Sequence, residues 1–147
     1  MKAQRPQVHA HCRCKKVSIE LAGPPILRAT CYCGSCRTAA EILGVSVDRG
    51  GGTDYTLYRK DRVGEVVGLS HLREHRLTAD SPTRRMVADC CNTPMAADFT
   101  KGFWISFYSA SLPAESRPTL RSYTAPFMAR LVLAWAAMGF RRPKLTW

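Results

Sequence analysis

A mainly β domain with a C-terminal helix is the fold class that the sequence predicts. Several short segments alternate apolar and polar residues, which is the period of a strand that buries one face. Loops that contain glycine or proline separate these segments, as in β-rich domains. The last thirty residues change to a helical pattern. At 147 residues, of which 46% are hydrophobic, the chain is long enough for one domain with its own core.

The strands are expected in order along the first hundred or so residues. A first strand is predicted where Val17, Ile19 and Leu21 alternate with polar residues, and a second over 26–30 after a turn at 23–25. The remaining expected elements are a brief helical turn at 38–43, a glycine loop at 50–52 and extended segments at 45–47, 55–59, 63–69, 72–77, 84–89 and 103–108.

The C-terminal part has a different character. Proline-containing loops separate a first unit, residues 1–112, from an extension over 113–147 in which a helix is expected at about 126–140. One face of this helix would carry Phe127, Leu131, Trp135 and Met138. The helix is too short to span a bilayer and contains Arg130, so no transmembrane segment is expected. We expect it to pack on the same domain, although a membrane surface or a second copy in a homodimer could also cover it.

The charge of the chain is strongly positive. It has 22 basic and 11 acidic residues, a formal net charge of +11. This charge favours anionic partners such as nucleic acid, an anionic membrane or a small acidic thiol, and it does not choose among them. A solvated basic surface without a partner explains it equally well. Residues 1–11 contain no apolar run of the kind that directs export, so we expect a cytoplasmic protein.

All seven cysteines fall in three tight clusters. An odd number of cysteines at Cys-x-Cys spacing suits metal ligands in a reducing compartment better than local disulfides, which remain an alternative. Zinc prefers thiolates arranged in a tetrahedron. The clusters are Cys12 and Cys14, then Cys31, Cys33 and Cys36, then Cys90 and Cys91.

Seven thiolates cannot fill two four-ligand sites, so the sequence predicts two zinc ions per chain in unlike sites. Cys31, Cys33 and Cys36 lie within six residues, so one loop can supply all three, and Gly34 is expected to permit a tight backbone there. Three cysteines leave a fourth position for water or substrate. The other four cysteines come from segments nearly eighty residues apart, so their zinc would hold the fold together.

Three motifs around these cysteines carry a resemblance to a known family. They are His11-Cys12-Arg13-Cys14-Lys15-Lys16-Val17, Cys31-Tyr32-Cys33-Gly34-Ser35-Cys36-Arg37 and Cys91-Asn92-Thr93-Pro94-Met95. They resemble the glutathione-dependent formaldehyde-activating enzyme family, which is also found in the centromere protein V group, over roughly residues 9–110. The resemblance implies a β-tent fold with two zinc ions. It places a structural ion on the first and last cysteine pairs and a catalytic ion on the middle triplet.

The chain departs from the family pattern at three places. The family's first late cysteine would fall on Ala88, whereas here Cys90 stands next to Cys91. Adjacent cysteines can share a metal only if the backbone turns, so Cys90 as the fourth structural ligand requires such a turn. Asn92 replaces the usual glycine, and we expect the turn to survive because asparagine tolerates the left-handed conformation. Lys15 replaces the glycine that follows the first cysteine pair.

A zinc ion with one free position can bind a thiol and lower its pKa, or polarise an aldehyde carbonyl. Both roles suit the addition of a thiol to formaldehyde or the reverse cleavage. The resemblance implies a zinc-dependent carbon–sulfur lyase that uses glutathione as the thiol. Arg37, next to Cys36, and Arg28 are candidate contacts for the substrate's carboxylates, although either can be an ordinary solvated charge.

Two other hypotheses remain open. A non-catalytic zinc module that binds nucleic acid or a protein partner would explain the net charge and the basic residues Arg141, Arg142 and Lys144. Alternatively, only one metal binds and the triplet is empty or oxidised. A protein side chain that fills the fourth position beside the triplet would count heavily against the enzyme.

Overall fold

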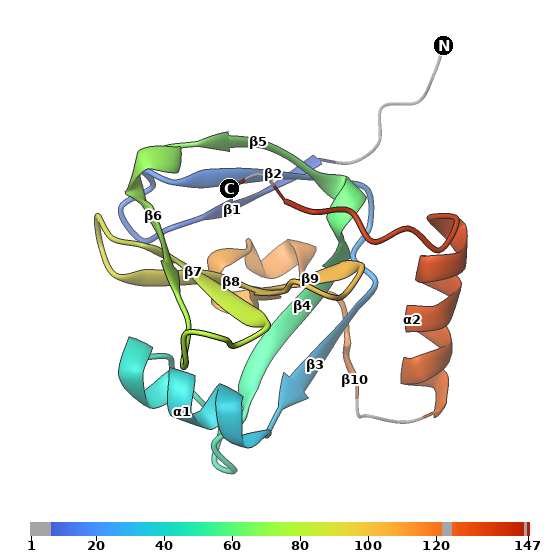
Figure 1. The fold of residues 1–147 in the computed structure, drawn as a ribbon, viewed down its shortest axis with the longest axis horizontal. Coiled ribbons are helices and arrows are strands. Elements are labelled where there is room, and N and C mark those ends of the chain that lie inside the picture. Colours follow the sequence, from blue (N-terminus) through green and yellow to red (C-terminus); the bar gives the residue numbers. More distant parts are fainter. Residues whose placement is uncertain (1–6, 122–124, 146) are drawn as a thin grey trace.

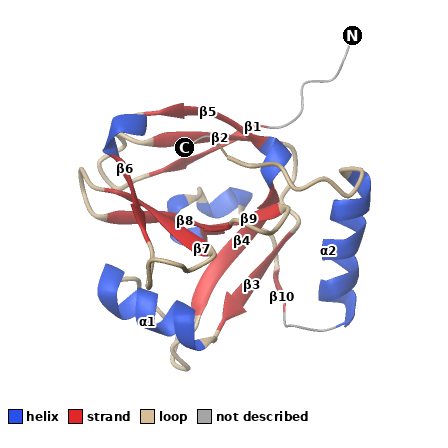
Figure 2. Ribbon diagram, in the orientation of Figure 1, coloured by secondary structure: helices blue, strands red, loops and turns tan. Residues whose placement is uncertain are grey.

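The computed structural model describes residues 7–121, 125–145 and 147. Within these residues the strands form two sheets, and two α-helices flank them (Figures 1 and 2). The elements are β1 (Gln7–His11), β2 (Ser18–Ala22), β3 (Leu27–Cys31), α1 (Gly34–Leu43), β4 (Thr53–Arg59), β5 (Val63–Val67), β6 (Leu72–His75), β7 (Thr83–Ala88), β8 (Thr93–Phe99), β9 (Trp104–Tyr108), β10 (Leu120–Arg121) and α2 (Ala125–Ala137), with four short 3-10 turns between them.

The smaller sheet has the order β1-β2-β5, and the larger sheet has the order β10-β3-β4-β9-β8-β7-β6. All neighbours pair antiparallel except β10, which runs parallel to β3. Two of the hairpin connections, β1 to β2 and β7 to β8, carry cysteines. The predicted mainly β fold with a C-terminal helix is confirmed.

The seven-stranded sheet separates two hydrophobic clusters because successive side chains along a strand point to opposite faces. On β4, Tyr58 faces the first cluster and Leu57 the second. The first cluster fills the space between the two sheets and includes Ala10, Cys12, Val17, Ile19, Leu21, Tyr58, Ala88, Met95, Ala96, Ile105, Phe107 and Leu112. The second lies on the face that the helices flank and includes Leu27, Ala29, Cys36, Tyr55, Leu57, Ala97 and Tyr108.

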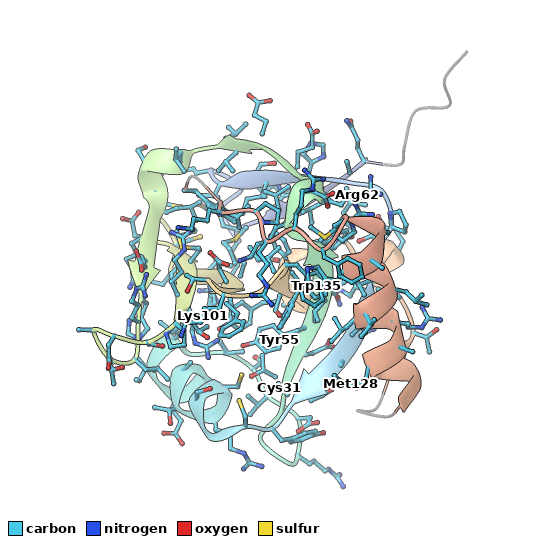
Figure 3. The ribbon with its side chains drawn as sticks, turned by 45° about the vertical axis from the view of Figure 1, so that its right-hand side comes forward. Cys31, Tyr55, Arg62, Lys101, Met128 and Trp135 are labelled. Carbon is cyan, nitrogen blue, oxygen red and sulfur yellow. The ribbon has the colours of Figure 1, made fainter. Side chains whose placement is uncertain are left out.

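Helix α2 stands beside β10 and β3 at one edge of the larger sheet (Figure 1). Its inward side chains are Leu131, which packs on the second cluster, and Trp135, whose ring stacks on Phe103 with centroids 5.6 Å apart (Figure 3). Met138, just after the helix, is buried. The side chain of Phe127, expected on the same face, lies outside the described residues. Within the described chain, no helix is both long and apolar enough to cross a membrane.

The end of α2 comes earlier than the sequence predicts. Gly139 and Phe140 adopt left-handed backbone conformations, with φ of 68° and 56°, which stops the helix. The chain then returns across the molecule, where Leu145 and Trp147 pack on the first cluster (Figure 1). The C-terminal residues therefore contact the core between the sheets as well as the helix-covered face.

Several local expectations need correction. The helical turn expected at 38–43 is a ten-residue helix that already begins at Gly34. The segment 45–47 is a loop, and β1 and β8 were not expected as strands. Gly34, which was expected to permit a tight backbone, begins α1 and does not have a positive φ, so its conformation does not require glycine.

Candidate metal centres

The four cysteines outside the triplet meet at one point. The sulfur atoms of Cys12, Cys14, Cys90 and Cys91 all lie within 4.8 Å of one another. The Sγ–Sγ distances are 3.7 Å for Cys12–Cys14, 3.8 Å for Cys12–Cys90, 3.3 Å for Cys14–Cys90 and 3.9 Å for Cys90–Cys91. Zinc with Zn–S bonds of about 2.3 Å holds tetrahedral sulfurs about 3.8 Å apart. The donor set and its spacing therefore fit a zinc ion.

Two hairpin turns bring these sulfurs together. The first pair lies in the connection between β1 and β2, and the second pair lies in the connection between β7 and β8. Each pair is followed by a residue in the left-handed region, Lys15 with φ of 63° and Asn92 with φ of 54°. The expected survival of the turn at Asn92 is confirmed. The amide of Val17 donates a hydrogen bond to the Cys12 sulfur at 3.3 Å, as suits a thiolate.

Arg13 and Thr93 fasten one turn to the other. The Arg13 amide donates to the Thr93 hydroxyl at 3.1 Å, and its guanidinium donates to the carbonyls of Cys91 at 2.8 Å and Asn92 at 3.0 Å. Desolvation opposes ionisation of Cys91, but the Thr93 hydroxyl and the Cys14 amide outweigh it and lower the pKa of Cys91 to about 6. The contacts of Arg13 join turns far apart in the sequence, so its role was not predicted.

The triplet lies at the junction of β3 and α1. Cys31 is the last residue of β3, Cys33 caps the N-terminus of α1 and Cys36 is in the first turn of that helix. Their sulfurs lie within 4.8 Å of one another, with 3.3 Å between Cys31 and Cys33. Among the described residues, no fourth cysteine, histidine or carboxylate joins this group. Three thiolates at this spacing fit zinc with one coordination position left over.

The start of α1 favours negative charge at the triplet. Helix N-termini present free N–H groups and the positive end of the helix dipole. The first turn of α1 contains no acidic residue that would compete for this potential. A hydrogen bond with Cys36, opposed by burial, lowers the pKa of Cys31 to about 7, while the same hydrogen bond and burial raise the pKa of Cys36. One sulfur of this pair therefore ionises before the other.

The glycine loop braces the triplet from one side. The Tyr32 hydroxyl donates to the Asp48 carboxylate at 2.5 Å, and Asp48 accepts the amides of Gly50 and Gly52, both at 2.9 Å. A Cβ atom at Gly52 would lie only 2.4 Å from the Thr30 side chain, so the loop can approach β3 only with glycine there. This loop thus fixes the segment between Cys31 and Cys33.

A cavity of about 330 Å³ opens beside the triplet. Its polar side is formed by the three cysteines with Ser35, Tyr55, Thr83, Arg85 and Ser106, and its apolar side by Ala29, Leu57, Ala97, Phe99, Trp104 and Leu131. Helix α2 thus contributes Leu131 to the wall. A second cavity of about 540 Å³ is lined by one cysteine, Cys12. The smaller cavity is the candidate substrate site because it contains every sulfur of the three-cysteine centre.

The profile of the family described as glutathione-dependent formaldehyde-activating enzyme matches residues 7–124. The chain belongs to this family. A crystal structure of a Rhodobacter sphaeroides protein has a similar fold, with a TM-score of 0.53 and 15% identity over 72% of this chain and 88% of that chain. No curated protein matches the chain in sequence. The match to the formaldehyde-activating family covers all seven cysteines and both sulfur clusters.

Neither arginine that the sequence proposed as a substrate contact lines the cavity of this family member. Arg28 forms an ion pair with Asp54 at 2.5 Å. Arg37 donates from Nε to the Tyr32 carbonyl at 2.9 Å, and its side chain is exposed. The cavity instead contains a cation that the sequence did not single out, Arg85, which is only 2% exposed.

Proposed function

We propose that this member of the family holds two zinc ions and acts on thiol–aldehyde adducts as a carbon–sulfur lyase at the three-cysteine site. One observation carries the proposal. Three sulfurs lie together at the wall of a cavity, and no further cysteine, histidine or carboxylate of the described chain completes their set. The family match supports the same chemistry, which family membership alone does not establish.

The other four cysteines have a structural role in this proposal. They link two hairpin turns that are remote in the sequence and complete a four-sulfur set. A complete set of thiolates leaves no position for a substrate. Their zinc would therefore stabilise the fold, and the reaction would belong to the triplet.

Zinc held by Cys31, Cys33 and Cys36 would supply a Lewis acid that favours the thiolate form of a thiol or polarises a carbonyl. In the cleavage direction, the carbon–sulfur bond of the adduct breaks. The adduct's hydroxyl oxygen loses its proton and becomes the aldehyde oxygen, and the released thiolate takes up a proton. The apolar wall formed by Phe99, Trp104 and Leu131 would keep bulk water from the reacting atoms.

Among the proposed substrate contacts, Arg37 is the better candidate. It lies one residue beyond Cys36 and its side chain is exposed, so it can meet a carboxylate of an acidic thiol such as glutathione. Arg28 is held by Asp54, so binding a substrate would compete with that ion pair.

The test compares the native chain with Cys33→Ser. Freshly purified, reduced protein should contain close to two zinc ions per chain, and Cys33→Ser should lose one zinc and all turnover of thiol–aldehyde adducts while remaining folded. Ile42→Ser is the control, since it introduces a serine on the exposed side of the same helix.

Two results would reject the proposal. One is the absence of tightly bound metal. The other is a protein with two zinc ions that turns over none of several adducts and binds duplex DNA with an affinity that falls steeply with salt, as a nucleic-acid module would.

A further inference from the structure

Arg85 is a buried cation without a carboxylate partner among the described residues. It comes from β7 and is 2% exposed. Lys60, the other buried cation of the described residues, differs from it because it pairs with Asp98 at 2.8 Å. The half-buried neighbour Arg84 also pairs with Asp98, at 2.7 Å. Because an unpaired charge is much more costly to bury than a paired one, the environment of Arg85 must supply negative charge in some other form.

The contacts of Arg85 point to the triplet. Its Nη1 donates to the Tyr55 hydroxyl at 3.0 Å and to the Tyr108 hydroxyl at 3.4 Å. Its Nη2 donates to the Cys36 sulfur at 3.8 Å. The phenols are neutral hydrogen-bond partners at neutral pH, because the ordinary pKa of a tyrosine is about 10. Among the partners of Arg85, the sulfur is the one that can be anionic.

The Cys36 sulfur accepts hydrogen bonds from two donors. The sulfur receives a second hydrogen bond from the Tyr55 hydroxyl at 3.7 Å, in addition to the one from Arg85. Two donors, one of them cationic, stabilise an acceptor that carries negative charge. Figure 3 shows Tyr55 and Cys31 between α1 and α2, which places this network on the face of the sheet that carries the triplet.

The charges also balance when all three cysteines are metal-bound thiolates. Three thiolates and a divalent ion have one net negative charge, and one guanidinium has one positive charge. We propose that Arg85 is the counter-charge of the three-cysteine metal centre, a positioning residue that holds Cys36 as a ligand through its hydrogen bond. The inference rests on the metal assignment in the proposed function and not on the lyase reaction.

The charge of Arg85 also affects the binding of a substrate thiolate as the fourth ligand of the metal. Binding of an anionic thiolate would bring the metal and its ligands to two net negative charges, one of which Arg85 offsets. Partners outside the metal shell commonly change metal affinity by about 10- to 100-fold when they are removed. Arg85 should have an effect of this size.

The experiment measures zinc affinity and does not depend on turnover. Competition with a chromophoric chelator gives the dissociation constant of the weaker zinc. Arg85→Met should raise this constant about 10- to 100-fold, with the tighter zinc retained. Arg85→Lys should lose less zinc affinity than Arg85→Met because lysine keeps the positive charge. Arg73→Met removes an exposed arginine from β6 and should leave both zinc affinities unchanged. Substitution with cobalt should show a shifted thiolate-to-metal absorption band in Arg85→Met.

The same Arg85 substitution made in a chain without the second zinc separates a role at the metal centre from a merely structural role. In Cys33→Ser, where the site is expected to hold no metal, Arg85→Met should leave the urea midpoint unchanged or raise it. In the zinc-loaded native chain the same substitution should lower the midpoint. The inference is overturned if Arg85→Met binds the second zinc as tightly as the native chain, if Arg85→Lys loses as much as Arg85→Met, or if Arg85→Met unfolds both backgrounds alike. Absence of a second zinc from the native chain would instead reject the proposed function.

Discussion

The two sulfur clusters are built in opposite ways. The four-cysteine cluster joins two hairpin turns that are distant in sequence, and its neighbours Arg13 and Thr93 fasten the turns together. The three-cysteine cluster comes from one strand-to-helix junction and opens on a cavity. Metal binding at the first therefore closes a long loop of the chain, whereas metal binding at the second organises a local segment. This difference is the reason for proposing that the first site serves folding and the second serves chemistry.

The strongest test of this division replaces one ligand in each cluster. Cys12→Ser should abolish folded yield, because structural zinc in small domains contributes about 10–16 kcal/mol and a whole domain is stable by only about 5–15 kcal/mol. Cys33→Ser should give a folded chain that lacks the second zinc. Circular dichroism and elemental analysis of both variants measure these outcomes. If Cys33→Ser unfolds as completely as Cys12→Ser, the two clusters do not differ in the way proposed.

Within the four-cysteine cluster, the adjacent pair provides the next test. Cys90→Ser should destabilise the protein as much as Cys91→Ser, since the Cys90 sulfur lies 3.3 Å and 3.8 Å from those of Cys14 and Cys12. Thermal unfolding of the two variants side by side gives the comparison. A Cys90→Ser protein that keeps its structural zinc and its stability would show that another group completes that site.

Stepwise removal of metal should separate the clusters without mutation. The triplet has one ligand fewer and Cys33 is exposed, so a chelator should extract its zinc first. Loss of this zinc should change far-ultraviolet circular dichroism little, and loss of the second should unfold the chain. Simultaneous release of both ions with a single unfolding step would contradict the assignment.

The cysteine sets themselves were predictable from the sequence. Cys31, Cys33 and Cys36 are close along the chain, so a local segment could bring them together, and the structure does so. The remaining four cysteines were assigned to a second site because the first site uses only the triplet. Their sulfurs do lie together. The fold class followed from alternating strands, which the structure has. Spacing and period are local properties, and local properties can be read from one sequence.

Other parts depend on tertiary contacts. Strand β8, Thr93–Phe99, contains a proline, two alanines and an aspartate, which are poor strand formers. It is an interior strand between β9 and β7, and its neighbours stabilise it there, including the ion pairs of Asp98 with Lys60 and Arg84. The consecutive residues Arg84 and Arg85 of β7 cannot be told apart from the sequence. Because neighbouring side chains of a strand point to opposite faces, Arg84 meets Asp98 and Arg85 meets Cys36. Which face carries the carboxylate and which carries the cysteines depends on the tertiary structure.

A smaller effect is expected at Lys15. Its left-handed backbone, φ of 63°, is strained for lysine and relaxed for glycine. Lys15→Gly should therefore stabilise the zinc-loaded protein by about 1 kcal/mol relative to Lys15→Ala, which removes the same charge but keeps a Cβ. Urea denaturation measures the difference. Lys16→Gly, at a position without positive φ, should instead destabilise. Equal stability of Lys15→Gly and Lys15→Ala would mean that the turn does not impose this conformation.

Gly34 follows the Cys-x-Cys pair of the triplet as Lys15 follows that of the four-cysteine cluster, and here glycine should be the less stable residue. Gly34 has no positive φ, begins α1, and has nothing within 4 Å of where a Cβ would lie. Gly34→Ala should stabilise the protein by about 0.5 kcal/mol, because alanine loses less backbone freedom in a helix, and both zinc ions should be retained. Urea denaturation with zinc analysis tests this, and a loss of the second zinc would show that the triplet needs a glycine after all. If both predictions hold, a glycine stabilises the protein at position 15 and destabilises it at position 34. The reason is that only the turn at position 15 has a left-handed backbone.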